Sequence, residues 1–343
     1  MKLNAQHTFK YTLRYGLLAL VFCVLLPSCF KEKNIASPSS KGIGQTNVIP
    51  MGSDYATQCF YSLATNKILS SNSRLAYDIL FDCASDSFNI WLNSAKFMAA
   101  LKTTKTDINS VTLQDTTGGS WNYERGSYNI DSNALGAWWA TTGSQPTSAG
   151  NVYIIDLGVD LGGNPLGFVK LKVNNFYGTS YSVTFASLTG TDSGTVLVPK
   201  DATRNYRYLS LLGAGQLLNI EPDKSTWDLL FTHYTTVFYV PYVLNYQVTG
   251  VLSNPSRVTA YVDSTAGSFS NLIISNFDVN KLQTNRDAIG YDWKTWTGVL
   301  YTTKTYYVYF IKTGDNHIYK FHFISFNNNQ GDKGYPTFEY SQL

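Results

Sequence analysis

Short runs in which hydrophobic and polar residues alternate recur along the chain. The clearest is "YVYFIKT" (307–313), which is followed by Gly-Asp-Asn (314–316) and a second alternating run, "HIYKFHFISF" (317–326). Because neighbouring side chains of a strand point to opposite faces, this pattern with its central turn predicts a β-hairpin. The segment "YPTFEYSQL" (335–343) predicts a closing strand, which Pro336 confines to a sheet edge or to a strand start.

Helical patterns are scarce in the chain. "TDINSVT" (106–112) and "FDVNKLQT" (277–284) each predict a turn or two of helix, with Asp107 or Asp278 near the N-cap. Of the 343 residues, 44% are hydrophobic and 14% are charged, and there are 25 Tyr, 19 Phe and 7 Trp. Aromatic and β-branched residues pack well on pleated surfaces, so this composition favours an all-β fold with minor helix.

Four motifs occur twice, in the same order and at similar spacing. The pairs are "YDILF" (77–81) and "WDLLF" (227–231), "LGAWWATTG" (135–143) and "IGYDWKTWTG" (289–298), "VYIIDLGVDLGGNPLGFVKLKV" (152–173) and "VYFIKTGDNHIYKFHF" (308–323), and "YSVTFASL" (181–188) and "YPTFEYSQL". An ordered set of repeats predicts an internal duplication. We therefore expect two tandem β-sandwich or half-barrel domains, at 55–192 and 200–343, joined by the polar segment 189–205.

The N-terminus has a basic leader, an apolar stretch from Tyr15 to Leu26, and small residues before Cys29. This pattern predicts a secretion signal at 1–28, and "LPSC" (26–29) resembles the lipobox of bacterial lipoproteins, whose cysteine is acylated. An ordinary signal peptide with a chance cysteine is the alternative. Residues 29–54 are rich in Ser, Gly, Pro and Asn and are expected to form a flexible tether to the outer membrane at the cell surface.

Two cysteines remain for the folded part, Cys59 and Cys83. In an oxidising compartment such a pair is expected to be bridged, since both cysteines fall in apparently consecutive strands of one hairpin. Two buried free thiols are the alternative.

The segments "WDLLFTHY" (227–234), "GYDWKTW" (290–296) and the C-terminal run from 307 through "TFEY" (337–340) resemble the HmuY family of haem-binding surface lipoproteins. The resemblance covers 200–343, and a weaker version covers 55–190. It implies a mostly-β fold and capture of haem or another porphyrin, from solution or from a haem protein, for iron uptake through a TonB-dependent receptor.

The resemblance also implies an iron site, because two histidines from loops clasp the iron in well-known members of the family. Outside the signal this chain has His233, His317 and His322, and none falls in the corresponding region, 245–305. A bis-histidine site is therefore not expected. His233 follows the Trp-Asp strand and is interpreted as a partly exposed strand residue that hydrogen-bonds a neighbour, with haem ligation as the alternative.

Two aromatic sets are the other candidates for a ligand site. Exposed rings can form a platform for a porphyrin face or a sugar ring, and core packing explains them equally well. The sets include Trp138, Trp139, Tyr291, Trp293 and Trp296. Asp78 and Asp228 each follow an aromatic residue at a strand start, and their repetition predicts a structural role in holding turns through backbone N–H groups.

The sequence has no GxSxG, HExxH, CxxC or P-loop motif, so catalysis is not expected. The net charge of +3 is small and dispersed, so nucleic acid is not an expected partner. We predict a non-catalytic, lipid-anchored surface protein that captures haem or a porphyrin. The alternative is a glycan- or protein-binding module that has lost its haem ligands.

Overall fold

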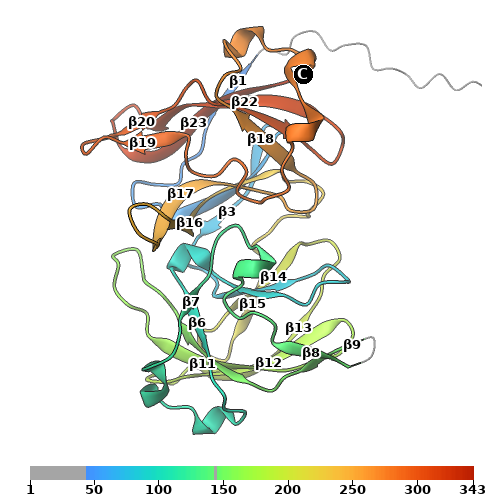
Figure 1. Cartoon of the computed structure of the whole chain (residues 1–343), viewed down its shortest axis with the longest axis vertical. Coiled ribbons are helices and arrows are strands. Elements are labelled where there is room, and N and C mark those ends of the chain that lie inside the picture. The colour runs from blue at the N-terminus through green and yellow to red at the C-terminus, as the bar shows by residue number, and fades with distance from the viewer. Residues whose placement is uncertain (1–43, 143–144) are drawn as a thin grey trace, which may run out of the picture. The chain divides into compact units, whose positions relative to one another are not determined.

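The computed structural model describes residues 44–142 and 145–343, and within these the regular structure consists of strands and short 3₁₀ helices (Figure 1). The predicted all-β class with minor helix is confirmed. In the described part of the chain, no helix is long and apolar enough to cross a membrane. The predicted signal segment and Cys29 lie outside the described residues.

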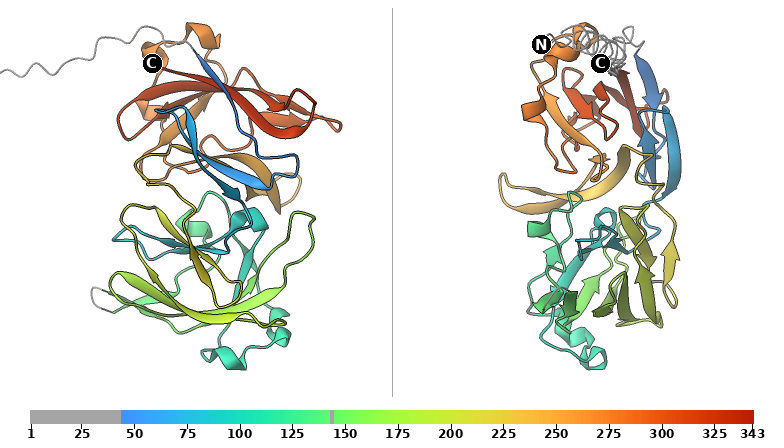
Figure 2. Two further views of the ribbon diagram at one scale, coloured as in Figure 1. Left: turned by 180° about the vertical axis from the view of Figure 1, so that it is seen from behind. Right: turned by 90° about the vertical axis from the view of Figure 1, so that its right-hand side faces the viewer.

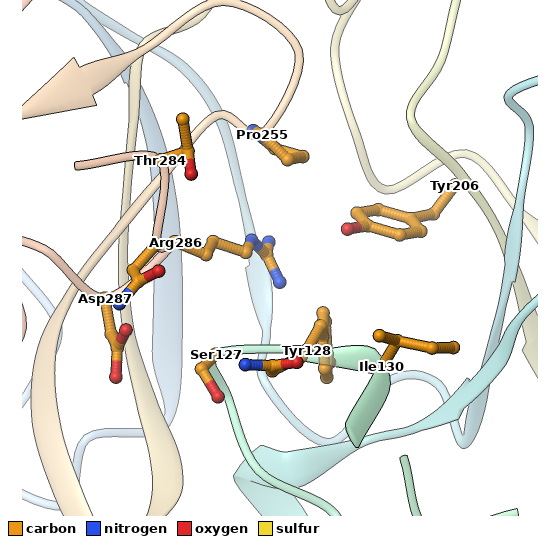
Figure 3. Close-up of a pocket in the computed structure, with 10 residues that line it drawn as sticks. Ser127, Tyr128, Ile130, Tyr206, Pro255, Thr284, Arg286 and Asp287 are labelled. Carbon is orange, nitrogen blue, oxygen red and sulfur yellow. The ribbon is translucent and has the colours of Figure 1, made fainter. Parts of the chain in front are cut away.

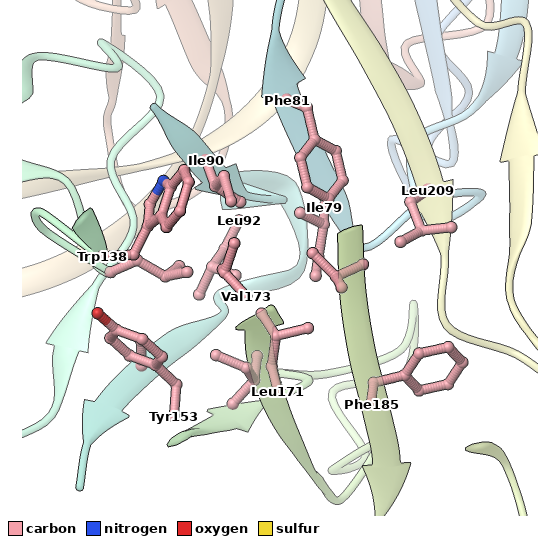
Figure 4. Close-up of a cluster of buried hydrophobic side chains, with 14 of the residues drawn as sticks. Ile79, Phe81, Ile90, Leu92, Trp138, Tyr153, Leu171, Val173, Phe185 and Leu209 are labelled. Carbon is pink, nitrogen blue, oxygen red and sulfur yellow. The ribbon is translucent and has the colours of Figure 1, made fainter. Parts of the chain in front are cut away.

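A first pair of sheets faces each other across a buried cluster, and we call it the first sandwich. One sheet has the order β13-β12-β11-β10-β6-β7 and the other β15-β14-β4-β5. Figure 4 shows Ile79 and Phe81 of β4 opposite Leu171 of β11 and Phe185 of β12 in this core. The strands are β4 Ile79–Asp82, β5 Ile90–Leu92, β6 Ala99–Lys102, β7 Asn122–Tyr123, β10 Val152–Asp156, β11 Phe168–Phe176, β12 Ser180–Ser187, β13 Ser193–Pro199, β14 Tyr206–Ser210 and β15 Gln216–Leu218.

A second pair of sheets forms the second sandwich. Its sheets have the orders β1-β23-β22-β21-β18 and β17-β16-β2-β3. The core between them is rich in aromatic rings, among them Phe231, Phe321 and Phe338. The strands are β1 Gln45–Val48, β2 Thr57–Ser62, β3 Lys67–Ser73, β16 Leu229–Phe238, β17 Leu244–Ser253, β18 Thr259–Asp263, β21 Val308–Lys312, β22 Ile318–Asn327 and β23 Lys333–Gln342.

Two small hairpins and seven 3₁₀ helices complete the described structure. Asp107 and Asp278 cap η2 and η7 by accepting the backbone N–H of Asn109 and Asn280, so the predicted N-caps are confirmed. The hairpins are β8 Trp139–Thr142 with β9 Gln145–Ser148, and β19 Lys294–Trp296 with β20 Tyr301–Thr303. The 3₁₀ helices are η1 Ser94–Lys96, η2 Ile108–Ser110, η3 Leu113–Thr116, η4 Ile130–Ser132, η5 Phe269–Asn271, η6 Ile274–Asn276 and η7 Val279–Lys281.

A third buried cluster lies between the two four-stranded sheets. In β4, Ile79 and Phe81 belong to the first core while Leu80 belongs to this middle cluster. In β16, Phe231 belongs to the second core and Leu230 to the middle cluster. These strands are therefore buried on both faces, which explains why "ILF" and "LLF" are continuous apolar runs rather than alternating ones.

The opening strands of the chain pair with its last strands. β1 pairs with β23, and β2 pairs with β16, whereas β13 pairs with β12 and β14 pairs with β4. Figure 2 shows the N-terminal strands, in blue, beside the orange and red C-terminal ones. The first sandwich is thus built from the continuous segment β4–β15, and the second from both ends of the described chain.

This arrangement differs from the segments expected from the sequence. Residues 193–199, expected within a linker, form β13, and residues 45–48, expected within the tether, form β1. Ile49 and Met51 are fully buried in the second core. The sequence around these residues is polar and rich in glycine, so it did not predict β1. This strand is stabilised by pairing with β23 rather than by an apolar pattern of its own.

The predicted C-terminal hairpin is present, since β21 and β22 pair antiparallel. β23 lies between β1 and β22, so the expectation that Pro336 marks an edge or a strand start was wrong. The register of β22 and β23 shifts between Ser325 and Asn327, opposite Thr337 and Lys333. Pro336 lies within this irregular stretch, where the absence of an N–H costs the ladder little.

Asp78 holds together three segments of the first sandwich. Its Oδ2 accepts the N–H of Leu211 at 2.7 Å, and its carbonyl accepts the N–H of Asn93 at 2.8 Å. Its carboxylate also forms an ion pair with Lys96, and both side chains are almost fully buried.

Asp228 makes the corresponding contacts in the second sandwich. Its Oδ2 accepts the N–H of Leu63 at 2.8 Å, its carbonyl accepts the N–H of Asn254 at 2.9 Å, and Arg257 Nε lies 3.4 Å from its Oδ1. The structural role predicted for both aspartates is confirmed, because each carboxylate accepts a backbone N–H from the residue that follows a neighbouring strand. That strand is β14, which pairs with β4, for Asp78, and β2, which pairs with β16, for Asp228.

Cys59 and Cys83 are both buried free thiols, so the expected disulfide is not formed. The reason is the strand pairing, since β2 pairs with β3 and β16 while β4 pairs with β5 and β14. The hairpin that was expected to bring the two cysteines together does not exist.

Candidate ligand-binding site

A cavity of about 500 Å³ lies in the second sandwich beside the β16–β17 hairpin, and we call it the aromatic cavity. Its lining includes aromatic rings, a histidine and two lysines. Strands β16, β17, β19, β20 and β23 contribute to it, together with the segments before β2 and before β19. It is lined by Tyr55, His233, Phe238, Tyr246, Gln247, Val248, Thr249, Tyr291, Lys294, Trp296, Tyr301 and Lys333.

The walls of the aromatic cavity are rings held in pairs. Phe238 stacks on Tyr246 with centroids 5.0 Å apart, and Phe238 also contacts Tyr291 at 5.7 Å. On the β19–β20 hairpin, Trp296 and Tyr301 lie 5.0 Å apart. Because Tyr246 and Trp296 are each about half exposed, at 51% and 53%, their ring surfaces remain available to a ligand.

Lys294 brings a buried cation to the same cavity. Its ammonium donates to the carbonyls of Thr249 and of Tyr291, the latter at 3.5 Å, and lies 4.2 Å from the Trp293 ring. Burial lowers the pKa of Lys294 to about 7. The side chain is therefore partly charged near neutral pH, where an anionic group in the cavity would favour its protonated form.

His233 is fixed within the cavity wall by two contacts. Its Nδ1 shares a hydrogen bond with Oγ1 of Thr249, its cross-strand partner, at 3.0 Å, and its ring stacks on Tyr55 at 5.5 Å. Burial, reinforced by the positive charges of Arg74 and Lys294, lowers the pKa of His233 to about 3. The imidazole is neutral at physiological pH, and the interpretation of His233 as a strand residue bonded to a neighbour is confirmed.

The two hairpins beside the cavity end in exposed apolar tips. Val240 at the β16–β17 turn is 85% exposed, and Val299 at the β19–β20 turn is 82% exposed. Both hairpins project to the left in Figure 1. Groups of large exposed apolar side chains are typical of interaction sites rather than of ordinary surface. The other large exposed apolar residues at these tips are Tyr239, Tyr242, Val243 and Leu300.

The structure brings together three of the six predicted ligand-binding candidates. His233, Tyr291 and Trp296 line the aromatic cavity. Trp293 is fully buried and stacks on Phe323 at 3.8 Å, which makes it part of the second core.

Trp138 and Trp139 lie in the other sandwich. Trp138 is buried, and its Nε1 donates to the carbonyl of Phe88 at 2.7 Å. Trp139 packs half-buried against the same core. For Trp138, Trp139 and Trp293 the core interpretation therefore holds.

Sequence reasoning missed the remaining lining residues. Tyr246 and Tyr301 were hidden among many tyrosines, and Tyr55 and Lys333 come from segments distant in sequence. One local signal was available: Lys294 is a charged residue in a short segment between two tryptophans, Trp293 and Trp296. A lysine at such a position indicates either a buried ion pair or a site for an anion.

The two other histidines of the described chain have local partners. His322 stacks on Phe269 at 3.9 Å, and its Nε2 lies 3.3 Å from Glu339 Oε2. His317 lies at the end of the turn before β22 and is exposed, and its ring lies edge-on to that of Tyr319 with centroids 6.3 Å apart. Within residues 44–142 and 145–343, no group of three or more His, Cys, Asp or Glu side chains is arranged to hold a metal ion.

The HmuY protein family model matches this chain over residues 54–340. The match covers well over half of the sequence, so the chain belongs to the HmuY family, a family of non-catalytic haem-binding proteins. The region matched is continuous and includes the first sandwich and all strands of the second except β1 and the end of β23. No protein of curated function shows significant sequence similarity to the chain.

Several solved structures are similar to the chain at low sequence identity. The apo HmuY analogue of Tannerella forsythia is 9% identical, with 88% of this chain and 96% of that chain covered and a TM-score of 0.24. Apo PinO from Porphyromonas gingivitis is also 9% identical, with the same coverage and a TM-score of 0.23. A Bacteroides fragilis protein named as a lipoprotein is 12% identical, with 87% and 88% covered and a TM-score of 0.21. These TM-scores are too low to support any statement about the site.

Proposed function

We propose that this HmuY-family protein is a non-catalytic surface protein that binds haem or a related porphyrin in the aromatic cavity. The observation that carries the proposal is the convergence of aromatic rings from two hairpins and a preceding loop on one cavity that also holds two lysine side chains. Its volume, about 500 Å³, falls within the range of about 300–1,000 Å³ that is typical of small-molecule sites.

A porphyrin matches this lining in shape and in charge. Its broad apolar faces require flat aromatic walls, which Tyr246 and Trp296 offer from two different hairpins. Its carboxylates require cations, and Lys294 and Lys333 both line the cavity. The protein would thus hold the ligand by stacking and by charge.

We assign His233 to the scaffold of the cavity rather than to the iron. Its Nδ1 bonds to Thr249 and its ring packs on Tyr55, so the side chain is fixed by the protein itself. The expected result for His233→Ala is an unchanged position of the haem Soret band, with a modest loss of affinity. A shift of the band in this variant would instead identify His233 as an iron ligand.

Titration of the purified protein with haemin, followed by the Soret band, tests the proposal. We expect saturable binding, weakened by about tenfold or more in the variant Tyr246→Ala/Trp296→Ala, because aromatic contacts each contribute about 1 kcal/mol beyond area burial. The matched control is Tyr177→Ala, which removes an exposed tyrosine of the first sandwich. No spectral change at micromolar protein, or equal binding by both variants, would overturn the proposal.

A glycan is the second candidate ligand for the same cavity. The half-exposed rings of Trp296 and Tyr246 beside the neutral polar side chains of Gln247 and Thr249 suit a sugar, whose C–H face stacks on aromatics while its hydroxyls hydrogen-bond. Saturable quenching of tryptophan fluorescence by an oligosaccharide, lost in Tyr246→Ala/Trp296→Ala without any haemin response, would favour this function.

We also infer that the chain is anchored to the outer membrane through Cys29 and delivers its ligand to a TonB-dependent receptor. The lipobox-like segment and the family support this inference. Metabolic labelling with a fatty-acid analogue should mark the wild type and not Cys29→Ser, which should be released from the membrane fraction. Equal labelling of both proteins would contradict the anchor.

We further propose that the two sandwiches arose by duplication. The repeated motifs support this, since "YDILF" leads into β4 and "WDLLF" leads into β16, each with its aspartate just before the strand. The paired contacts of Asp78 and Asp228 give the same support.

A further inference from the structure

A second cavity, of about 450 Å³, lies where segments of the two sandwiches meet. It shares no lining residue with the aromatic cavity. Figure 3 shows the Arg286 side chain crossing it, with Tyr206 on one side and Tyr128 on another. The lining residues are Ser127, Tyr128, Asn129, Ile130, Tyr206, Pro255, Thr284, Asn285, Arg286 and Asp287.

The Arg286 side chain is 95% buried without an anionic partner. Its exposed fraction is 5%, and neither Nε nor Nη1 has a hydrogen-bond partner. Among the described residues, no carboxylate lies within ion-pair distance of this guanidinium. A buried cation whose donors are unsatisfied is costly, so a group that supplies acceptors in this cavity would be bound favourably.

The guanidinium is held in place by its surroundings. The Arg286 carbonyl accepts the N–H of Ser253 on β17 at 2.6 Å, which fixes the backbone. The guanidinium carbon lies 4.7 Å from the ring centre of Tyr128 and 5.4 Å from that of Tyr206. Ring contacts hold the plane of the guanidinium, and the N–H groups on Nε and Nη1, which have no partner, are available for recognition of an anion.

The charges around the cavity favour a ligand with a single negative charge. Asp287 also lines the cavity, but Figure 3 shows its carboxylate directed away from the guanidinium. One cation with an aspartate nearby matches a monocarboxylate better than a dianionic phosphate. The remaining polar groups, on Ser127, Asn129, Thr284 and Asn285, are neutral and suit hydroxyl or amide groups.

We propose that this cavity is a binding site for a small, hydroxyl-rich carboxylate of the sugar-acid class, with Arg286 as its carboxylate-binding residue. The apolar side chains of Ile130 and Pro255 would face the C–H surface of the sugar ring. The site is independent of the aromatic cavity and of haem.

Calorimetric titration of the full-length protein with D-glucuronate tests this site, with D-glucose and inorganic phosphate as the other probes. We expect glucuronate to bind with a Kd of roughly 1 mM or tighter, and glucose not to bind. Arg286→Gln should weaken glucuronate binding by at least about tenfold. Thr284→Trp should do the same by filling the cavity from an exposed position at its rim.

Thr284→Trp keeps the test decisive if Arg286→Gln fails to fold, because it leaves the guanidinium and its ring contacts in place. Haemin titration of both variants should match the wild type, which separates this proposal from the one for the aromatic cavity. Absence of glucuronate binding, binding unaffected by Thr284→Trp, or binding of phosphate in preference would overturn the proposal. Loss of stability in Arg286→Gln without any glucuronate binding would show that Arg286 only joins the two sandwiches.

Discussion

In the first sandwich Gly136 (φ +62°) leads into the buried Trp138 and the β8–β9 hairpin, and in the second Gly290 (φ +63°) leads into the buried Trp293 and the β19–β20 hairpin. Both segments have a glycine with positive φ that precedes a buried tryptophan, by two residues in the first and by three in the second. The residue that follows differs, because Trp139 packs against the first core whereas Lys294 lines the aromatic cavity.

This comparison separates the residues that the fold requires from those that line the cavity. A glycine in the left-handed region and a large buried ring fix the start of each hairpin. In the first sandwich the residue after the buried tryptophan is Trp139, so a hairpin of this kind forms there without a cation at that position. Lys294 therefore costs the fold a buried charge, and a ligand with an anionic group would offset that cost.

The largest expected effect concerns the two matched aspartates. Asp78→Ala leaves buried Lys96 without its partner, so we expect the free energy of unfolding to fall by about 3–5 kcal/mol. Asp228→Ala should cost about 1–2 kcal/mol less, because Arg257 keeps Asp315 as a second partner. Urea denaturation of both variants measures this difference. An equal or larger loss for Asp228→Ala would break the comparison.

A second prediction concerns Glu124 in the first sandwich, whose buried carboxyl accepts the N–H groups of Leu92 and Ala134 at 3.0 and 3.4 Å. Burial raises the pKa of Glu124 from 4.5 to about 8, so its contribution to stability is full below pH 4.5 and is lost as the pH rises towards 8. We expect the wild type to lose about 2 kcal/mol of unfolding free energy over this window. Glu124→Gln should remove most of the loss; an unchanged slope in this variant would contradict the assignment.

In the second sandwich, Lys294 should make the free energy of unfolding depend on pH in the opposite direction. Burial lowers the pKa of Lys294 from 10.5 to about 7. The contribution of Lys294 to the free energy of unfolding is therefore fully present above pH 10.5 and is lost as the pH falls towards 7. At acidic to neutral pH, Lys294→Met should raise the free energy of unfolding by about 1 kcal/mol, because it removes a buried charge. Thermal melts across this pH range provide the measurement. A destabilised variant would mean that the ammonium is needed to hold Thr249 and Tyr291 together.

The smallest effect is expected for the cysteines, one in each sandwich. Because Cys59 and Cys83 are free and buried, a reductant should leave the melting temperature unchanged. A thiol reagent should label both residues only after the chain is unfolded. A melting temperature that falls on reduction would show that the two thiols are bridged in the purified protein.

The sequence pattern predicted those elements that are determined by residues close to one another in the chain. The β21–β22 hairpin followed from alternation around a Gly-Asp-Asn turn, and the caps at Asp107 and Asp278 followed from side chains that bond to N–H groups two residues ahead. Strand partners were not predictable in this way, because alternation shows which residues share a face but not which strand lies beside them. The pairing of β2 with β16 is of this kind.

The aromatic cavity shows the same limit. His233, Tyr291 and Trp296 stood out as unusual residues within recognisable motifs, and all three line the cavity. Tyr55 and Lys333 reach it from segments nearly 280 residues apart, and only the fold brings them together. Trp293 was also a candidate for an aromatic ligand platform, but its ring packs against Phe323 and Phe326 in the core.

The pairing of β1 and β2 with β23 and β16 also sets an order of events during synthesis of the chain. The strands of the first sandwich end at Leu218, so all of them are available while the last third of the chain is still being synthesised. The second sandwich must wait for Gln342, and until then β1–β3 keep open hydrogen-bonding edges. The earliest strands to emerge are thus the last to find their partners, which makes them the segment that most needs protection from aggregation before folding is complete.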